Sequence, residues 1–224
     1  MTNQEMKDEI QKRLGLQGID DYNELTLVEG WIYRGVIDLL SRTRAVVRCV
    51  HLQTTAGVDT YTLDHSILSL VEIEDGRYGK VHRDDVEWYP SLYPPELQSR
   101  EFALIRSDVL RIPVPGEDGE VNVWAVLRPQ KMTAPEHSPG DEAYGAIPEE
   151  WHDAIVLYAL WQGSDYADDQ SGGMGEKYRV WYEGQDGRTG RLSEIRKQIN
   201  KRGTARLPRR NVKLRPVASR RAWV

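Results

Sequence analysis

The segment at residues 147–167, IPEEWHDAIVLYALWQGSDYA, constrains the fold more than any other part of the sequence. Pro148 and the two glutamates that follow it are typical of the first turn of a helix. Trp151, Ile155 and Tyr158 lie on one side of this predicted helix, and further apolar residues cover its other sides. A helix that is apolar all round is buried all round. The sequence therefore predicts a helical bundle around this segment, with part of the cover supplied by neighbouring copies of the chain.

Three other stretches carry helical patterns. Residues 2–14 are rich in helix formers and lie between Thr2, which suits a helix start, and Gly15, which suits a helix end. In residues 21–43, apolar side chains recur every three or four positions after a pair of aspartates that can cap the helix. Residues 174–202 are also helical in pattern, with glycines near the middle that predict a bend or break.

Residues 45–128 have a different character, because their apolar residues are β-branched or alternate with polar ones. Short runs of this kind, separated by turn residues, are typical of β-strands. Residues 107–108 and 116–120 are the predicted hairpin turns. The two prolines that follow Ile112 predict that its strand lies at the edge of a sheet.

These patterns predict an α+β fold: a helical bundle with a β-rich insertion and an extended C-terminal arm. The predicted parts are N-terminal helices at residues 1–44, a β-rich insertion at 45–128, a connector loop at 129–146, C-terminal helices at 147–202 and a basic arm at 203–224.

The charge of the chain is unevenly distributed. The formal net charge is −5, yet residues 196–224 contain eleven Lys or Arg and no Asp or Glu, so this end carries +11 and the remainder −16. Pro208 and Pro216 exclude a continuous helix there, and residues 212–215 alternate as a short strand would. Such an end is either a solvated or nucleic-acid-binding arm, or a segment that docks on an acidic partner.

No catalytic or metal-binding motif is found in the sequence. Cys49 is the single cysteine, so an internal disulfide is impossible and a reducing compartment fits best. The spacing of the five histidines does not match a metal-binding motif. His152 and Asp153 could be two members of a catalytic triad, but the sequence has no GxSxG motif to supply the nucleophile. The glycine-rich stretch 171–177 lacks the spacing of a phosphate-binding loop. We therefore expect no enzymatic activity, no cofactor and no metal.

A membrane role is also not indicated. The longest apolar run, residues 154–161, is too short to cross a bilayer, and the first ten residues are charged where a secretory signal would be apolar. The tryptophans are more informative, and most are expected in the core. Trp223 is the exception, because at the tip of a basic arm an indole is useful only as an anchor in a partner.

The order of these elements resembles the head-to-tail adaptor (connector) proteins of tailed bacteriophages. The stretch YTLD at 61–64, followed by ILSLVE, is similar to a Y-x-L-P stretch that leads into a strand, with Asp64 in place of the proline. Residues 109–129 are similar to a hairpin that ends in proline, and residues 177–184 resemble the following helix. The closest match is IPEEWHDAIVLYAL at 147–160.

This resemblance implies a structural protein of the virion neck, assembled in the host cytoplasm. Such proteins form a ring, usually twelve-fold, that continues the DNA channel of the portal and receives the tail. The implied partners are the portal, sister copies, a downstream neck or tail protein and, passively, genomic DNA. The arm would dock on the portal by strand addition and charge complementarity. The predicted portal-docking residues are Leu207, Arg209, Arg210, Val212, Leu214, Arg215, Val217, Arg220, Arg221 and Trp223. The predicted core of the bundle and ring comprises Trp31, Trp151, Ile155, Tyr158, Trp161 and Trp181.

Two alternatives stay open. A DNA-binding protein could use the basic end to grip phosphates, and its affinity would then fall steeply with salt. Another neck component, such as a stopper or a tail terminator, would have the same sequence properties. A phage hydrolase would need a pair of acids or a metal cluster that the sequence does not show.

Overall fold

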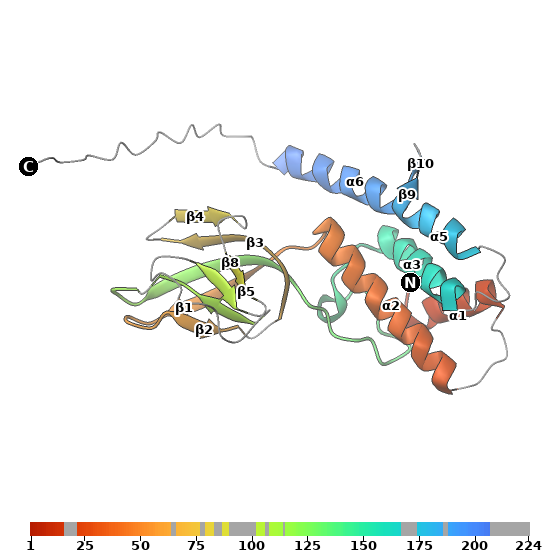
Figure 1. Ribbon diagram of the computed structural model, residues 1–224, viewed down its shortest axis with the longest axis horizontal. Helices are drawn as coiled ribbons and strands as arrows, with labels where there is room; N and C mark the ends of the chain where they lie inside the picture. The colour runs from red at the N-terminus through yellow and green to blue at the C-terminus, as the bar shows by residue number, and fades with distance from the viewer. Residues whose placement is uncertain are drawn as a thin grey trace, which may run out of the picture.

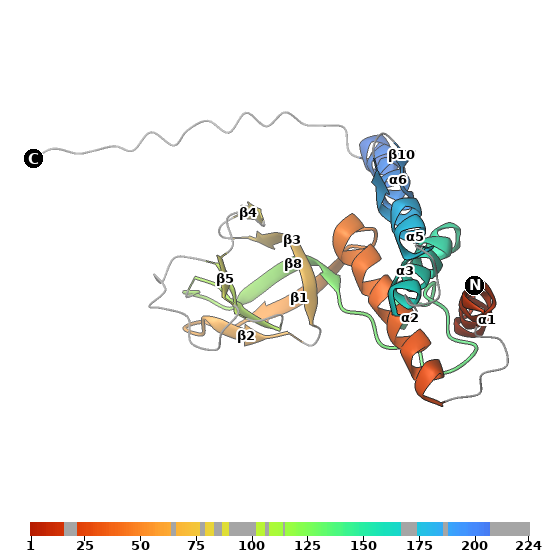
Figure 2. The same cartoon turned by 45° about the vertical axis from the view of Figure 1, so that its right-hand side comes forward.

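Figures 1 and 2 show a computed structural model of the chain, in which a helical part and a β part lie side by side. The structure describes residues 1–15, 22–63, 66–76, 79–82, 87–89, 102–105, 108–113, 115–166, 174–185 and 188–206. Two chain segments connect the parts, one after helix α2 and one after strand β8. The described elements confirm the predicted α+β fold.

The helical part contains α1 (Asn3–Leu14), α2 (Tyr22–Thr43), α3 (His152–Tyr166), α5 (Met174–Glu183) and α6 (Arg191–Arg206). Helix α1 starts and ends as predicted. The Thr2 hydroxyl accepts a hydrogen bond from the Glu5 amide at 3.3 Å, and the Glu5 carboxylate accepts one from the Thr2 amide at 2.8 Å. Gly15 ends the helix in the left-handed region with φ 72°. The predicted caps of the second helix, Asp20 and Asp21, lie outside the described residues.

Helix α3 is the central element of the helical part. It packs against α1, α2 and α5, so three helices of the same chain cover most of its surface. Gly163 permits the closest approach, since a Cβ there would lie 2.5 Å from Leu14 Cδ1 and 2.9 Å from Trp31 Cζ3. The predicted burial of this segment in a helical bundle is confirmed, and the cover by neighbouring copies stays a prediction. The buried residues of this core include Met6, Ile10, Val28, Ile32, Leu39, Leu40, Ile147, Trp151, Ile155, Leu160, Tyr182 and Ile195.

Between α5 and α6 the chain forms a small hairpin of β9 (Gly184–Gln185) and β10 (Arg188–Thr189), so the predicted break is confirmed. Helix α6 then runs to Arg206, four residues beyond the predicted end of the C-terminal helices at residue 202. Basic residues at a helix C-terminus favour such continuation, because they interact well with the helix dipole. Figure 1 shows α6 reaching past the end of α2.

The β part contains two four-stranded sheets. The first has the order β1 (Arg48–Thr54), β8 (Gly119–Leu127), β3 (Ile67–Asp75), β4 (Gly79–His82), and the second has the order β2 (Thr60–Thr62), β7 (Val109–Arg111), β6 (Ala103–Ile105), β5 (Glu87–Tyr89). All described pairs are antiparallel except β5 with β6. The two sheets share an apolar core that includes Ile73, Leu104, Leu110, Ile112, Val121 and Val123.

One predicted hairpin turn is confirmed and the other is wrong. Strands β6 and β7 pair antiparallel on either side of residues 107–108, as expected. Residues 116–120, in contrast, comprise the end of the connection between β7 and β8 and the first two residues of β8, and these two strands belong to different sheets. The alternating pattern predicts both strands, but it does not indicate which other strand each of them pairs with.

The predicted edge position of the strand near Ile112 is also wrong. Strand β7 is paired on both sides, with β2 and with β6. It ends at Arg111, so Pro113 and Pro115 follow the strand rather than interrupt it. A proline beyond the last paired residue removes no hydrogen bond of the ladder, and therefore places no restriction on the strand.

Candidate interaction surfaces

His152 and Asp153, the pair with catalytic residue types, point to separate partners. His152 is 1% exposed, and its Nε2 lies 3.0 Å from the Ile147 carbonyl oxygen while Nδ1 lies 3.0 Å from the amine of Met1. Burial lowers the pKa of His152, so the neutral imidazole is favoured. Asp153 forms an ion pair with Arg191 at 2.9 Å. The two side chains hold the helical part together and do not form a catalytic pair.

The residues that the structure describes contain no group of three or more His, Cys, Asp or Glu side chains that could hold a metal ion. In this same part of the chain, no helix combines the length and the apolar character that a membrane span needs. Among the described residues, the surface features considered for function are a hollow at the junction of the two parts, a seam along α3 and two exposed patches around tryptophans.

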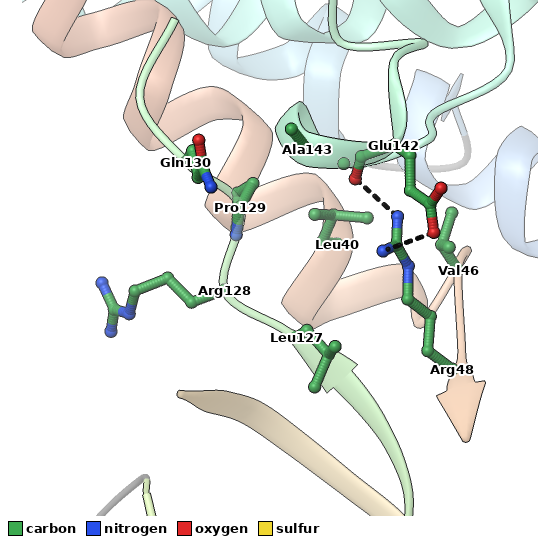
Figure 3. Close-up of a pocket in the computed structure, with 10 residues that line it drawn as sticks. Leu40, Val46, Arg48, Leu127, Arg128, Pro129, Gln130, Glu142 and Ala143 are labelled. Carbon is green, nitrogen blue, oxygen red and sulfur yellow. Dashed lines mark hydrogen bonds and ion pairs between the residues drawn. The ribbon is translucent and has the colours of Figure 1, made fainter. Parts of the chain in front are cut away.

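The junction hollow lies between α2, the ends of β1 and β8, and the turn at residues 142–145 (Figure 3). Its volume is about 80 Å³, far below the several hundred Å³ of a usual ligand site. Arg48 spans the junction, with Nη2 donating to the Glu142 carbonyl at 2.6 Å and Nη1 3.3 Å from the Glu142 carboxylate. Arg128 points away from this pair (Figure 3). The hollow is a structural joint rather than a ligand pocket.

The α3 seam is the side of α3 left open between α1 and α5. Leu157 lies on it, between one hollow of about 290 Å³ that also involves α1 and another of about 260 Å³ that also involves α5 and α6. The charges at its rim pair with each other: Arg13 with Glu9, and Arg191 with both Asp153 and Glu194. The seam therefore has an apolar floor and a rim whose named charges are engaged in ion pairs.

Five of the six predicted core residues are buried or partly buried. Trp31, Trp151 and Ile155 are 7%, 2% and 0% exposed. Tyr158 and Trp161 are partly buried, and their rings meet edge to face with centroids 5.6 Å apart. The sixth residue, Trp181, is 44% exposed and lies on the surface of α5.

Trp181 belongs to an exposed stripe on α5, which we call the Trp181 patch: Met174, Lys177 and Trp181. Their spacing places the three side chains on one side of the helix. Met174 is 38% exposed, and the Lys177 ammonium lies 4.8 Å from the centroid of the Trp181 ring. This cation–π contact keeps a positive charge over the exposed indole.

A second exposed tryptophan lies on the outer side of the first sheet. Trp124 is 37% exposed, and its cross-strand neighbours are Cys49 on β1 and Glu72 on β3. Cross-strand neighbours share one side of a sheet. We call this surface the Trp124 face: Val47, Cys49, Glu72, Glu74, Glu120 and Trp124.

The Trp124 face is apolar toward the helical part and acidic beyond it. Val47, just before β1, is 38% exposed. Glu72 pairs with Lys80 at 2.8 Å, and Glu120 pairs with His51 at 2.8 Å. Burial, followed by the charges of Glu74 and Glu120, raises the pKa of the Cys49 thiol. Trp124 is among the tryptophans that were expected in the core. The alternation of VNVWAVL, in which Val121 and Val123 are buried, is the sequence signal that could have indicated its outward position.

The ten predicted portal-docking residues lie outside the described residues, from Leu207 to Trp223. Helix α6 ends at Arg206, immediately before this segment. Helix α6 is therefore the described element that precedes the predicted arm.

The α+β fold, with surfaces built from exposed tryptophans and charged residues, defines a protein suited to structural contacts with other proteins. A family model described as SU10 adaptor protein matches residues 1–212. The chain belongs to the SU10 adaptor protein family. The expected relationship to phage head-to-tail adaptors is thereby confirmed, and the chain is a structural component of the virion that works with other virion proteins. No curated protein matches the chain.

Proposed function

We propose that this protein forms a ring in the phage neck that docks on the portal and joins the DNA-filled capsid to the tail. The observation that carries the proposal is the family match over residues 1–212, which spans the helical part, the β part and the start of the arm. In this role the protein is not an enzyme. It assembles in the host cytoplasm, with twelve copies as the expected number.

The charge distribution supports this role. The formal charge of residues 1–195 is −16, so the ring would repel the DNA that passes through its channel. The arm carries the opposite charge and a terminal Trp223, which suits docking on an acidic groove of the portal. Residues 212–215 would add a strand to the edge of a portal sheet.

Truncation of the arm tests the proposal. The full chain and a chain ending at Arg206 are each coexpressed with the portal protein, and the complexes are examined by light scattering and electron microscopy. We expect rings on the portal with the full chain and their loss on truncation, because α6 and both cores end before residue 207. Portal complexes of equal yield with both chains would contradict arm docking.

The same two chains separate the alternatives. If the protein binds DNA through its basic end, the full chain will bind duplex DNA with an affinity that falls steeply with salt, and the truncated chain will not. If the protein is a stopper or a tail terminator, electron microscopy of the particle will place it below the ring that contacts the portal.

A further inference from the structure

We infer that the Trp181 patch of one copy packs against the Trp124 face of the next copy in the ring. This inference rests on the proposed ring assembly and specifies which two surfaces form the contact between neighbours. One surface comes from the helical part and the other from the β part, so a single chain offers both halves of the contact.

The first argument is the distribution of exposed apolar side chains. In the part of the chain that the structure describes, five large apolar side chains are more than a third exposed: Val47, Val58, Trp124, Met174 and Trp181. Four of these five lie on the two proposed surfaces. Exposed tryptophans are enriched among the residues that dominate binding energy in protein interfaces. Burial of both indoles would give the contact an apolar centre with a charged rim.

The second argument is charge complementarity. The Trp181 patch carries the Lys177 ammonium, and no ion pair within the described ranges involves Lys177. The Trp124 face carries three glutamates, of which Glu72 and Glu120 are paired to Lys80 and His51. Glu74 has no ion-pair partner among the described residues. A contact between the two surfaces would therefore pair Lys177 of one copy with the acidic side of the next.

The third argument is symmetry. A two-fold axis that passes through either surface pairs that surface with itself, which would bring lysine toward lysine or glutamates toward glutamates. Like charges disfavour both arrangements. Contact between two different surfaces is instead head-to-tail, and head-to-tail contacts close into rings when the rotation between copies permits. The charges of this chain thus disfavour a two-fold dimer centred on either surface, and they suit a head-to-tail ring.

Cys49 makes the inference directly testable. It is the single cysteine of the chain, it is partly exposed, and it lies beside Trp124. A second cysteine is introduced by Met174→Cys on the Trp181 patch, and portal-bound rings are treated with a bismaleimide crosslinker. We expect covalent ladders that extend to the full ring. Met174→Cys combined with Cys49→Ser should give no ladder, and neither should Lys12→Cys, an exposed residue of α1, with native Cys49.

The outcomes separate this inference from the proposed function. If rings form but Met174→Cys yields only monomers, or if Lys12→Cys yields an equal ladder, the inferred contact is wrong and the ring stands. If the full chain forms no ring with the portal, the proposed function itself fails. As a second measurement, Lys177→Glu should reduce ring yield at least tenfold, and Glu74→Lys in the same chain should restore it. Normal ring yield with Lys177→Glu would overturn the inference.

Discussion

At the scale of single residues, His152 links the stability of the helical part to pH. Its pKa in the folded state lies below the unfolded value of 6.5, chiefly because burial disfavours the imidazolium. The unfolded chain therefore binds more protons below pH 6.5, so this residue's contribution to stability is present above that pH and is lost as the pH falls. We expect the thermal midpoint to decline between pH 7.5 and pH 5, as measured by circular dichroism.

His152→Gln should flatten this decline, because glutamine can still donate to the Ile147 carbonyl but cannot take up a proton in this range. His51→Gln is the matched control, since the His51 side chain is 64% exposed. A decline of the same size in His152→Gln and the unmodified chain would show that other groups cause it.

Gly163 provides a second prediction at this scale. Gly163→Ala places a methyl group within 3 Å of Leu14 and Trp31, so overpacking should outweigh the gain in helix propensity. We expect a net loss of about 1–2 kcal/mol in the free energy of unfolding, measured with urea. Gly30→Ala in α2 meets no atom within 4 Å, and should stabilise the chain by up to about 1 kcal/mol. Equal effects of the two substitutions would contradict the packing around Gly163.

The sequence predicted the buried residues of α3 better than the surface ones. The apolar pattern of residues 147–167 placed Trp151 and Ile155 in the core, because a helix with no polar side has no other stable position. Trp181 was placed there too, although it is 44% exposed. Helical periodicity tells which residues share a side of a helix, but it cannot tell whether another helix covers that side.

At the scale of elements, two polar contacts join α2 to α5. The Tyr182 hydroxyl donates to the Asp38 carboxylate at 2.6 Å, and Arg42 pairs with Glu183 at 2.6 Å beside it. Burial, with the nearby Asp38 carboxylate, raises the pKa of Tyr182 far above its usual value. The phenol is therefore a donor at all ordinary pH values.

Tyr182→Phe should lower the free energy of unfolding by about 1–3 kcal/mol, because the partly buried Asp38 carboxylate loses its short bond from the phenol and keeps only the longer one from Arg42 Nη1 at 3.5 Å. Tyr178→Phe is the matched control, since Tyr178 is buried on the same helix and its hydroxyl has no hydrogen bond in the described part of the chain. Urea unfolding of both variants checks the prediction. A loss in Tyr178→Phe as large as in Tyr182→Phe would mean that ring packing, not the hydrogen bond, is responsible.

Helix ends that depend on local sequence signals were predicted correctly, but the pairing of strands was not. Thr2 and Gly15 fix the ends of α1 through bonds within the helix, so the sequence alone suffices there. Strand β8 pairs with β1 and β3, which lie more than 40 residues earlier in the chain. Which strands pair depends on the shared core of both sheets, and the turn at residues 116–120 carries no information on that choice.

At the scale of the whole molecule, the two parts have separate apolar cores that meet at a small junction. Val126 of β8 is buried in the helical core, although its neighbours Val123 and Ala125 belong to the core of the β part. Beside this contact, the Gln130 amide donates to the Ala143 carbonyl at 2.9 Å, and Arg48 holds the same turn through Glu142. The orientation of the β part relative to the helices thus depends on a few polar contacts around the hollow of Figure 3.

Arg48→Ala should loosen this junction while both cores stay folded. The Arg48 hydrogen bond to the Glu142 carbonyl is worth about 1 kcal/mol, so we expect the amides of Gln130 and Ala146 to exchange with deuterium about fivefold faster. Amides of α3, which is covered by three helices, should be unchanged. Arg128→Ala is the control, because Arg128 lines the same hollow but points away from Glu142. Equal acceleration in both variants would show that loss of charge near the junction, and not loss of the Arg48 contact, frees the turn.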